Sequence, residues 1–270
     1  MLKRLLITGA AGGLGMLARS RLGAMAETLR LSDIAAMEPA AKGEEVIQCD
    51  LGDAAAVDKL VDGCDGIVHF GGISVEDRFQ PILNANILGL YNLYEAARRH
   101  GHPRILYASS NHVMGFHRQD EHLDASAPFE PDSLYGVSKC FGEHMARLYF
   151  HKYGQETAMV RIGSCFPEPK DHRMLATWLS PDDFMALIHC VFRAPRLGCP
   201  IIYGVSANDC TWWDNTQVSW LGWVPKDNSE KFRAKLDDSV SLPDPRSTEA
   251  IYQGGKFAAL PILTGEDQAS

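Results

Sequence analysis

The chain has 270 residues, of which 46% are hydrophobic, so it can bury the core of one large domain or of a domain with a small appended lobe. Its formal net charge of −8 argues against nucleic acid or an anionic membrane as the main partner. Seven scattered cysteines without a Cys-x-x-Cys pair indicate free thiols in a reducing, cytoplasmic compartment. No uninterrupted apolar run approaches the roughly 18 residues of a membrane-spanning helix, so we expect no membrane segment.

Short apolar runs alternate with helix-forming stretches through residues 1–165. The apolar runs predict strands at 4–9, 28–33, 45–50, 66–72, 104–110 and 157–163. The stretches between them predict helices at 13–25, 53–61 and 84–100, and a further helix from 133 onward. This alternation predicts an α/β fold, a Rossmann-type doubly wound parallel sheet with helices on both faces.

The pattern changes in residues 166–270. In "LSPDDFMALIHCVFRAP", Ser180 is a predicted N-cap and Pro181 the first helical residue. One more strand is predicted at 200–205, and the polar, proline-containing end from about Leu236 is expected to wrap the surface. We therefore expect residues 1–165 to form the main domain, and 166–270 a small C-terminal substrate-covering lobe integrated with it.

Glycines crowd the junction between the first predicted strand and the first predicted helix. In "TGAAGGLG", the spacing is Gly-x-x-Gly-x-x-Gly. Such glycines permit a tight turn and a close approach of the backbone to a pyrophosphate, while the helix N-terminus offers N–H groups and a partial positive charge. The junction predicts a dinucleotide site formed by Gly9, Gly12, Gly13, Leu14 and Gly15.

The end of the second predicted strand indicates which dinucleotide is bound. Asp33, followed by Ile34, can accept hydrogen bonds from both adenosine ribose hydroxyls and would repel a 2′-phosphate. No arginine follows in "SDIAAME", so NAD is favoured over NADP; the alternative is a solvated turn aspartate. Asp50 and Leu51, at the end of the third strand, suit contacts with the adenine edge.

The segment "SLYGVSKCFGEHMA" sets Tyr135 and Lys139 four residues apart at the head of a predicted helix, so both project from nearly the same face. A second stripe has the spacing of a buried helix face; its members are Val137, Phe141, Met145 and Leu148. The fifth strand ends in Ser109 and Ser110, and the C-terminal ends of parallel strands border the ligand crevice. These serines, Tyr135 and the glycine turn should therefore converge.

Tyr-x-x-x-Lys with an upstream serine resembles the short-chain dehydrogenase/reductase superfamily, and the glycine spacing, "HFGG" and "NILG" are similar to its extended branch. The resemblance implies that Tyr135 is the acid/base, Lys139 its partner and Ser110 the hydroxyl that holds the substrate oxygen. A nearby ammonium lowers the pKa of a phenol, so we expect Lys139 to activate Tyr135. Further implied cofactor contacts are Phe70, Gly71, Gly72, Asn86, Lys139 and Ser164.

At finer grain the chain resembles the bacterial uronate dehydrogenases nearly end to end. The sequence segments that show this resemblance are "GGISVE", "SSNHV", "YGVSKCFGE", "VRIGSC", "RMLATWLS" and "WWDN". It implies oxidation of C1 of cyclic D-glucuronate or D-galacturonate by NAD to an aldaro-lactone, in a homo-oligomer, with Arg173 gripping the C6 carboxylate. Implied contacts to sugar hydroxyls or to the cofactor amide are Ser74, Ser110, Asn111, His112 and Ser164, beside Tyr135.

Several alternatives stay open from the residues. A UDP-sugar epimerase or dehydratase of the same branch would produce no net NADH, and a non-catalytic dinucleotide sensor would have no reason to keep Ser110, Tyr135 and Lys139 together. Arg173 could instead pair with Asp171. No metal is expected, because the one candidate cluster suits a solvated loop: His117, Asp120, Glu121 and His122. The preferred uronate, and whether Trp212 and Trp213 belong to the core or to a pocket wall, stay undecided.

Overall fold

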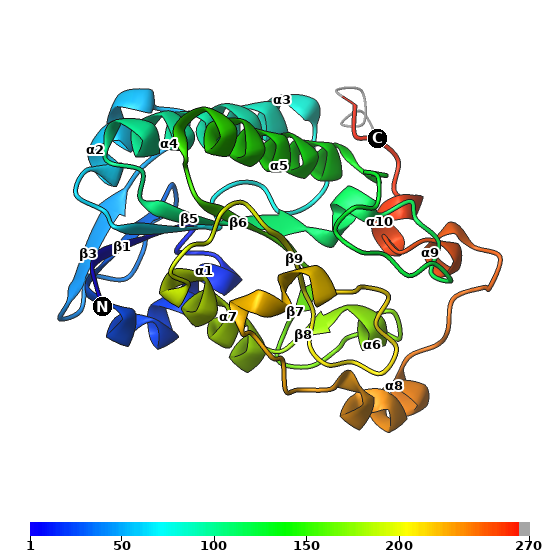
Figure 1. Cartoon of the computed structure of the whole chain (residues 1–270). Coiled ribbons are helices and arrows are strands. Elements are labelled where there is room, and N and C mark those ends of the chain that lie inside the picture. Colours follow the sequence, from blue (N-terminus) through cyan, green and yellow to red (C-terminus); the bar gives the residue numbers. More distant parts are fainter. Residues whose placement is uncertain (265–270) are drawn as a thin grey trace.

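A computed structural model describes residues 1–264, and a seven-stranded parallel sheet forms its centre (Figure 1). The strands run in the order β3-β2-β1-β4-β5-β6-β9, which confirms the doubly wound arrangement. Their bounds are β1 Leu2–Thr8, β2 Ala26–Asp33, β3 Glu44–Gln48, β4 Gly66–His69, β5 Arg104–Ser110, β6 Thr157–Ile162 and β9 Ile201–Gly204.

Helices cover both faces of this sheet (Figure 1). One face carries α2 (Ala54–Val61), α4 (Gly89–Arg99) and α5 (Leu134–Tyr153), and the other carries α1 (Gly13–Arg21) and α7 (Pro181–Arg193). Successive side chains of a strand point to opposite faces: Leu5 and Ile7 belong to the core beneath α1 and α7, and Leu6 to the core beneath α2 and α4. Two short segments precede α4, namely α3 (Phe79–Ile82) and the π-helical η2 (Leu83–Leu88). The short helix η1 (Gly23–Met25) follows α1, and η3 (Asn111–Met114) follows β5.

In the C-terminal third, β9 and α7 belong to the central sheet and the layer that covers it, and the other elements lie beside the carboxyl ends of the strands (Figure 1); a separate lobe from residue 166 stays a prediction. Ser180 caps α7 by accepting a hydrogen bond from the Asp183 amide, with Pro181 in the first turn, as predicted. The remaining elements are β7 (Ser164–Cys165), α6 (Met174–Thr177), β8 (Trp178–Leu179), η4 (Thr216–Leu221), η5 (Ser229–Phe232), α8 (Arg233–Ser239), α9 (Thr248–Ile251) and α10 (Lys256–Ala259). The end of the predicted lobe, residues 265–270, lies outside the described residues.

The C-terminal strap, residues 252–257, is more deeply held than a surface-wrapping tail. Gln253 is fully buried, and its side-chain amide donates to the carbonyls of Arg118 and Glu121 and accepts from Trp213 Nε1 at 2.9 Å. Trp213 itself stacks on Tyr203, with ring centroids 5.3 Å apart. Trp213 therefore belongs to the core and anchors the strap.

The prediction of the buried face of the helix from residue 133 onward was largely wrong, because much of the apolar stripe faces solvent. Val137 and Leu148 are 49% and 45% exposed, while Phe141 and Met145 pack only partly against the core. The buried face of α5 instead carries small and polar residues, which are Tyr135, Gly136, Ser138, Lys139, Gly142, Glu143, Ala146 and Tyr149. The Tyr107 side chain approaches so closely that a Cβ on Gly142 would lie 2.1 Å from the Tyr107 hydroxyl, so a larger side chain does not fit at this position.

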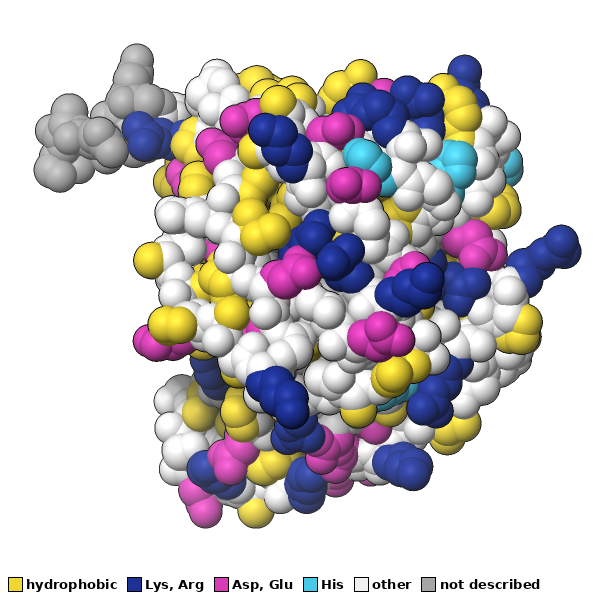
Figure 2. All heavy atoms as spheres, turned by 90° about the vertical axis from the view of Figure 1, so that its left-hand side faces the viewer, with side chains coloured by type: hydrophobic (Ala, Val, Ile, Leu, Met, Phe, Trp, Pro, Cys, Tyr) yellow, Lys and Arg dark blue, Asp and Glu magenta, His cyan; other side chains and the backbone are white. Residues whose placement is uncertain are grey.

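Charges of both signs are interspersed on the face that carries the N-terminal strands (Figure 2). Arg4 and Arg30 both pair with Glu45 of β3, and Arg19 pairs with Glu44 at 2.7 Å. Such pairing gives this face no basic field of the kind that attracts a phosphate backbone. No helix among residues 1–264 is both long and apolar enough to cross a membrane.

A buried ion pair lies between α5 and β6. Arg161 donates to both carboxylate oxygens of Glu143 at 2.9 Å, and both side chains are almost fully buried. Ser109 donates to Glu143 at 2.6 Å and Arg161 donates to the Tyr203 hydroxyl at 3.0 Å, so the remaining hydrogen-bonding groups are also used. This network fixes β5, which carries the predicted catalytic serine, to the helix that carries Tyr135.

Replacing Glu143 with alanine should destabilise the protein by about 3–5 kcal/mol, because it leaves the Arg161 charge buried and unpaired. Glu143→Gln keeps the shape and one acceptor and should cost less. Asp120→Ala, which breaks an exposed pair with Arg118, should change stability by less than about 1 kcal/mol. Urea unfolding of the three variants checks this, and similar stabilities of Glu143→Ala and Asp120→Ala would contradict it.

Candidate active site

A cavity of about 1210 Å³ opens along the carboxyl ends of β1, β2, β4, β5 and β6. The crevice at this edge is where parallel α/β sheets bind ligands. With the exception of Asn86, it is lined by every residue that the sequence predicts to bind a cofactor or a substrate. The structure thus brings together residues from Gly9 to Arg173 at one site.

The glycine turn between β1 and α1 lets backbone segments, and a bound pyrophosphate, come close to one another. Gly9 has a φ of +68°, and a Cβ there would lie 2.7 Å from the Gly71 backbone. A Cβ on Gly15 would lie 2.2 Å from the Gly9 carbonyl, whereas one on Gly13 would meet nothing within 4 Å. Gly12 is the N-cap of α1 and supplies no side-chain cap. The first amides of α1 therefore face open space, where they can bind a pyrophosphate.

Asp33 is held at the end of β2 with both carboxylate oxygens in use. Oδ2 accepts from the Ala11 amide at 2.9 Å and Oδ1 from the Ala35 amide at 3.0 Å. The lone pairs that remain can accept ribose hydroxyls. The lysines and arginines that line the cavity are Lys139, Arg173 and Lys256, none of them in the β2–β3 segment that would face a 2′-phosphate.

Asn86 is not among the residues that line the cavity. It lies in η2, where Oδ1 accepts from the Ile73 amide at 2.7 Å and Nδ2 donates to the Ile73 carbonyl and to Ser138. Asn86 therefore positions the Gly72–Ile73 turn, and its contact with a cofactor stays a prediction. Asp50 and Leu51 line the cavity but follow the end of β3 at Gln48 by two and three residues.

Tyr135 and Lys139 share the buried face of α5 as predicted, beneath the end of β5. Ser133 caps the helix by accepting from the Gly136 amide at 2.9 Å, and the Tyr135 amide donates to Glu76 at 3.0 Å. Lys139 Nζ lies 5.6 Å from the centroid of the Tyr135 ring and donates to the Ala108 carbonyl at 2.8 Å. The phenol, the ammonium and Ser110 all line the cavity.

Burial opposes the expected activation of Tyr135 by Lys139, which stays a prediction. Burial raises the pKa of Tyr135 to about 12, and Ser110, a hydrogen-bonding neighbour, only partly opposes this. Burial also lowers the pKa of Lys139 to about 8. The Lys139 ammonium donates to the Ala108 carbonyl and lies 5.6 Å from the centroid of the Tyr135 ring, where a positive charge favours the phenolate but does not remove the cost of burying it. Further positive charge is needed beside Tyr135, and an oxidised nicotinamide ring would supply it.

Arg173 lies just before α6 and is held by two contacts. Its Nε donates to the carbonyl of Gln253 at 2.6 Å. With the Asn111 amide oriented so that its nitrogen donates to the Ile162 carbonyl, the Asn111 oxygen accepts from Arg173 Nη2 at 2.6 Å. Asp171, the alternative partner, instead accepts from the Met174 amide at 2.9 Å. Among residues 1–264, Nη1 has no hydrogen-bond partner, so one edge of the guanidinium is left for a ligand.

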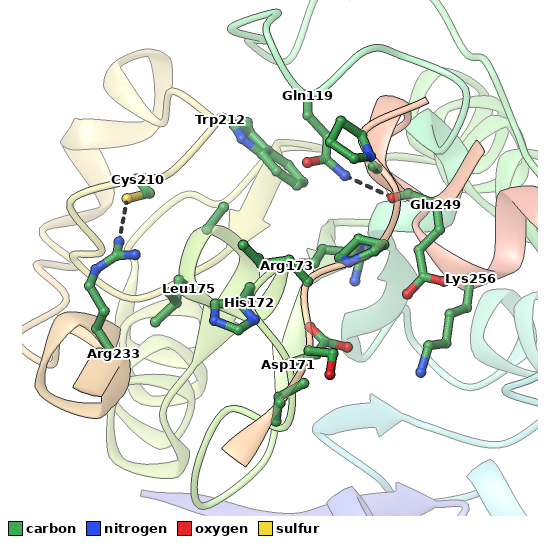
Figure 3. A pocket seen from close by; sticks show the side chains of 17 residues that line it. Gln119, Asp171, His172, Arg173, Leu175, Cys210, Trp212, Arg233, Glu249 and Lys256 are labelled. Carbon is green, nitrogen blue, oxygen red and sulfur yellow. Dashed lines mark hydrogen bonds between the residues drawn. The ribbon is translucent and has the colours of Figure 1, made fainter. Parts of the chain in front are cut away.

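A second cavity, of about 680 Å³, adjoins the first at Arg173 (Figure 3). Asp171, Arg173, Glu249 and Lys256 line both cavities. Trp212 forms part of the wall of the second one and also belongs to a buried apolar cluster with Trp213, so it has both of the roles left undecided. Within residues 1–264, no group of three or more His, Cys, Asp or Glu side chains is arranged to hold a metal; His117 instead pairs with Glu121 at 2.7 Å.

Several site residues were missed from the sequence. Phe257 of the C-terminal strap lines the main cavity and stacks on His112, with ring centroids 3.9 Å apart. Asp132 is buried behind His112, and Gln253 holds Arg173. The one feature of the sequence that could have indicated these residues is the glycine pair Gly254–Gly255 in an otherwise polar tail. Gly255 has a φ of +60°, and the strap turns there toward the site.

Three comparisons with known proteins agree with this geometry. Residues 5–183 match the model of the NAD dependent epimerase/dehydratase family. A uronate dehydrogenase of Agrobacterium fabrum is 60% identical over 262 residues, covering 97% of this chain and 99% of that protein. The crystal structure of a uronate dehydrogenase mutant from Agrobacterium tumefaciens complexed with NAD superposes with a TM-score of 0.95 at 59% identity, over 97% of this chain and 98% of that one. For a glucuronic acid dehydrogenase from Chromohalobacter salexigens, the TM-score is 0.96 at 55% identity, over 97% and 98% of the two chains. The chain therefore belongs to the NAD-dependent epimerase/dehydratase family and, within it, to the uronate dehydrogenases.

Proposed function

We propose that the protein oxidises C1 of cyclic D-glucuronate or D-galacturonate with NAD, giving the aldaro-lactone. The observation that carries the proposal is the convergence of Ser110, Tyr135 and Lys139 on one cavity that is also lined by Arg173. In the proposed mechanism Ser110 holds the C1 oxygen, Tyr135 takes the hydroxyl proton and Lys139 orients the cofactor. NAD, bound along the glycine turn, accepts the hydride from C1.

The other contacts follow from the same placement. The cavity that Tyr135 and Arg173 line is also lined by four residues that can hold sugar hydroxyls or the cofactor amide: Ser74, Asn111, His112 and Ser164. Arg173 would bind the C6 carboxylate through its unpaired edge, since a guanidinium matches a carboxylate with two parallel hydrogen bonds. The pyrophosphate would lie on Gly9 to Gly15, the ribose on Asp33 and Ile34, and the adenine near Asp50 and Leu51. Phe70, Gly71 and Gly72 would flank the cofactor from β4.

The decisive experiment mixes the protein with NAD and a panel of uronates, neutral aldoses and UDP-sugars and follows NADH absorbance. Glucuronate or galacturonate should yield NADH, and UDP-sugars should not. Conversion of a UDP-sugar without net NADH would favour the epimerase alternative. Failure of every sugar to react, with NAD still bound, would favour a dinucleotide sensor.

The cofactor assignment gives a separate prediction. Because Asp33 should bind the ribose diol and repel a phosphate, NAD should exceed NADP by well over tenfold in kcat/KM. Asp33→Ala should narrow that ratio, mainly by weakening NAD, while Asp50→Ala should leave it nearly unchanged. Steady-state kinetics with both cofactors measures the ratio, and equal use of NAD and NADP by the unaltered enzyme would refute the role given to Asp33.

We also propose that the protein works in the cytoplasm as a homo-oligomer. All seven cysteines are free thiols, which suits a reducing compartment. Large apolar side chains are exposed along η2, α4 and α5, namely Leu88, Tyr91, Val137, Leu148 and Tyr153. Patches of this kind mark contact surfaces, so Tyr91→Asp combined with Leu148→Asp should lower the mass measured by light scattering. An unchanged mass, or a monomeric parent, would exclude this surface.

A further inference from the structure

Asp132 has a buried carboxylate, and two glycines leave the space that it occupies. It lies just before the N-terminus of α5, and its side chain is inaccessible to solvent. A Cβ on Gly115 or on Gly254 would come within 1.9 or 2.0 Å of its Oδ2, so two glycines from separate segments make room for this oxygen. The proposed mechanism gives Asp132 no role, yet a buried carboxylate is costly unless its partners stabilise it.

Those partners connect it to the active site. Oδ2 is 2.7 Å from His112 Nδ1, and Oδ1 accepts from the Ser133 hydroxyl at 2.8 Å. Ser133 is also the N-cap of α5, the helix that carries Tyr135. Asp132 thus helps to orient both the imidazole of His112, which it contacts directly, and the phenol of Tyr135, through the helix cap Ser133.

The ring of His112 is held on its other sides as well. Phe257 of the C-terminal strap stacks on its face at 3.9 Å between centroids, and Tyr135 meets it edge-on at 5.9 Å. Asp132 holds the Nδ1 corner, and His112 lines the main cavity. Among residues 1–264, Nε2 has no hydrogen-bond partner, so it is the polar atom left for a ligand.

We propose that Asp132 is a positioning residue that keeps the His112 proton on Nδ1, so that Nε2 accepts a hydrogen bond from one hydroxyl of the sugar and selects substrates that carry it. A carboxylate only accepts hydrogen bonds, so the nitrogen facing it must be the N–H. The opposite nitrogen then presents a lone pair. The identity of the sugar rests on the proposed function; the tautomer does not.

The surrounding charges are consistent with a neutral ring. Burial lowers the pKa of His112 below its usual range, and Arg173 acts in the same direction, whereas Asp132 and Glu76 oppose it. With a single proton on the ring, the position of that proton decides whether Nε2 accepts or donates.

The first test is independent of activity. Nitrogen NMR of the labelled protein, with the His112 signals identified by their loss in His112→Phe, should show a protonated Nδ1 and an unprotonated Nε2. Asp132→Asn should shift the population toward the Nε2–H form. A proton on Nε2 in the parent protein would overturn the proposal whatever the substrate is.

The second test reads specificity. With glucuronate or galacturonate and their 2-, 3- and 4-deoxy analogues, the parent should lose about ten- to hundredfold in kcat/KM on one analogue, because a buried acceptor is left unpaired. Asp132→Asn and His112→Phe should show a similar loss on the full uronate, mainly in KM, and almost no further loss on that analogue.

Asp120→Asn is the matched control, since it removes an exposed carboxylate of the same loop whose ion-pair partner is Arg118. It should match the parent on every sugar. If Asp132→Asn lost the same factor on every sugar, or kept the parent's preference, Asp132 would be structural only and the proposal would fail. If the parent oxidised no uronate, the proposed function would fail, and the NMR result would still decide the tautomer.

Discussion

Replacing Tyr135 with phenylalanine should reduce kcat by about 10²–10⁴-fold, the usual effect of losing a general base. The ring would remain beside the stacked rings of His112 and Phe257, whose centroids lie 5.9 and 6.2 Å from it, so the packing of the site should survive. NAD affinity, measured by fluorescence or calorimetry, should change little, because the glycine turn and Asp33 are untouched. The loss should therefore appear in kcat and not in cofactor binding.

Two further results would support this assignment. Tyr153→Phe, on the same helix but exposed, should keep the parent rate. Burial raises the pKa of Tyr135 to about 12, so the phenolate is scarce at neutral pH and the parent rate should increase with pH from 7 to 9. Tyr135→Phe should lose that increase. If the variant keeps more than about a tenth of the parent kcat, another group is the base.

Those parts of the site that lie on regular elements could be predicted from the sequence. The glycines between β1 and α1, Asp33 at the end of β2, and Ser110 at the end of β5 occupy the same edge of any parallel sheet built in this order. Tyr135 and Lys139 are one helical turn apart, so a single helix places both. For these residues, the local sequence pattern and the sheet topology both place the side chain at the same edge of the sheet.

What could not be predicted depends on contacts between distant segments. Gln253 holds Arg173 across 80 residues of sequence, and nothing in the polar tail distinguishes this glutamine from an exposed one. The buried face of α5 was misjudged for a related reason: hydrophobic spacing favoured Val137 and Leu148, but the close approach of Tyr107 at Gly142 selects small residues there. Burial of Tyr135, which raises its pKa, likewise depends on the packing of distant segments and not on the spacing of Tyr135 and Lys139.

Arg173→Ala should reduce kcat/KM for glucuronate or galacturonate by about ten- to hundredfold or more. Hydrogen bonds to charged groups contribute about 1.5–3 kcal/mol, and each ~1.4 kcal/mol corresponds to tenfold. The carboxylate also fixes the orientation of the sugar, because C1 at the far end must present its hydrogen to the nicotinamide. Neutral glucose and galactose should be poor substrates of the parent and should be barely affected by the substitution.

Arg173→Lys should recover only part of the loss. An ammonium keeps the charge, but it cannot at once donate to the Gln253 carbonyl, to Asn111 and to a carboxylate in the fork geometry. Arg233→Ala is the matched control, because this half-exposed arginine lines the adjoining cavity but not the main one (Figure 3). It should retain the parent kcat/KM on all four sugars. An equal loss on acidic and neutral sugars in Arg173→Ala would instead mean that Arg173 only holds the C-terminal strap in place. The carboxylate site would then have to lie elsewhere; His172 lines only the adjoining cavity and pairs with Asp237, so Lys256, which lines the main cavity, would be the next candidate.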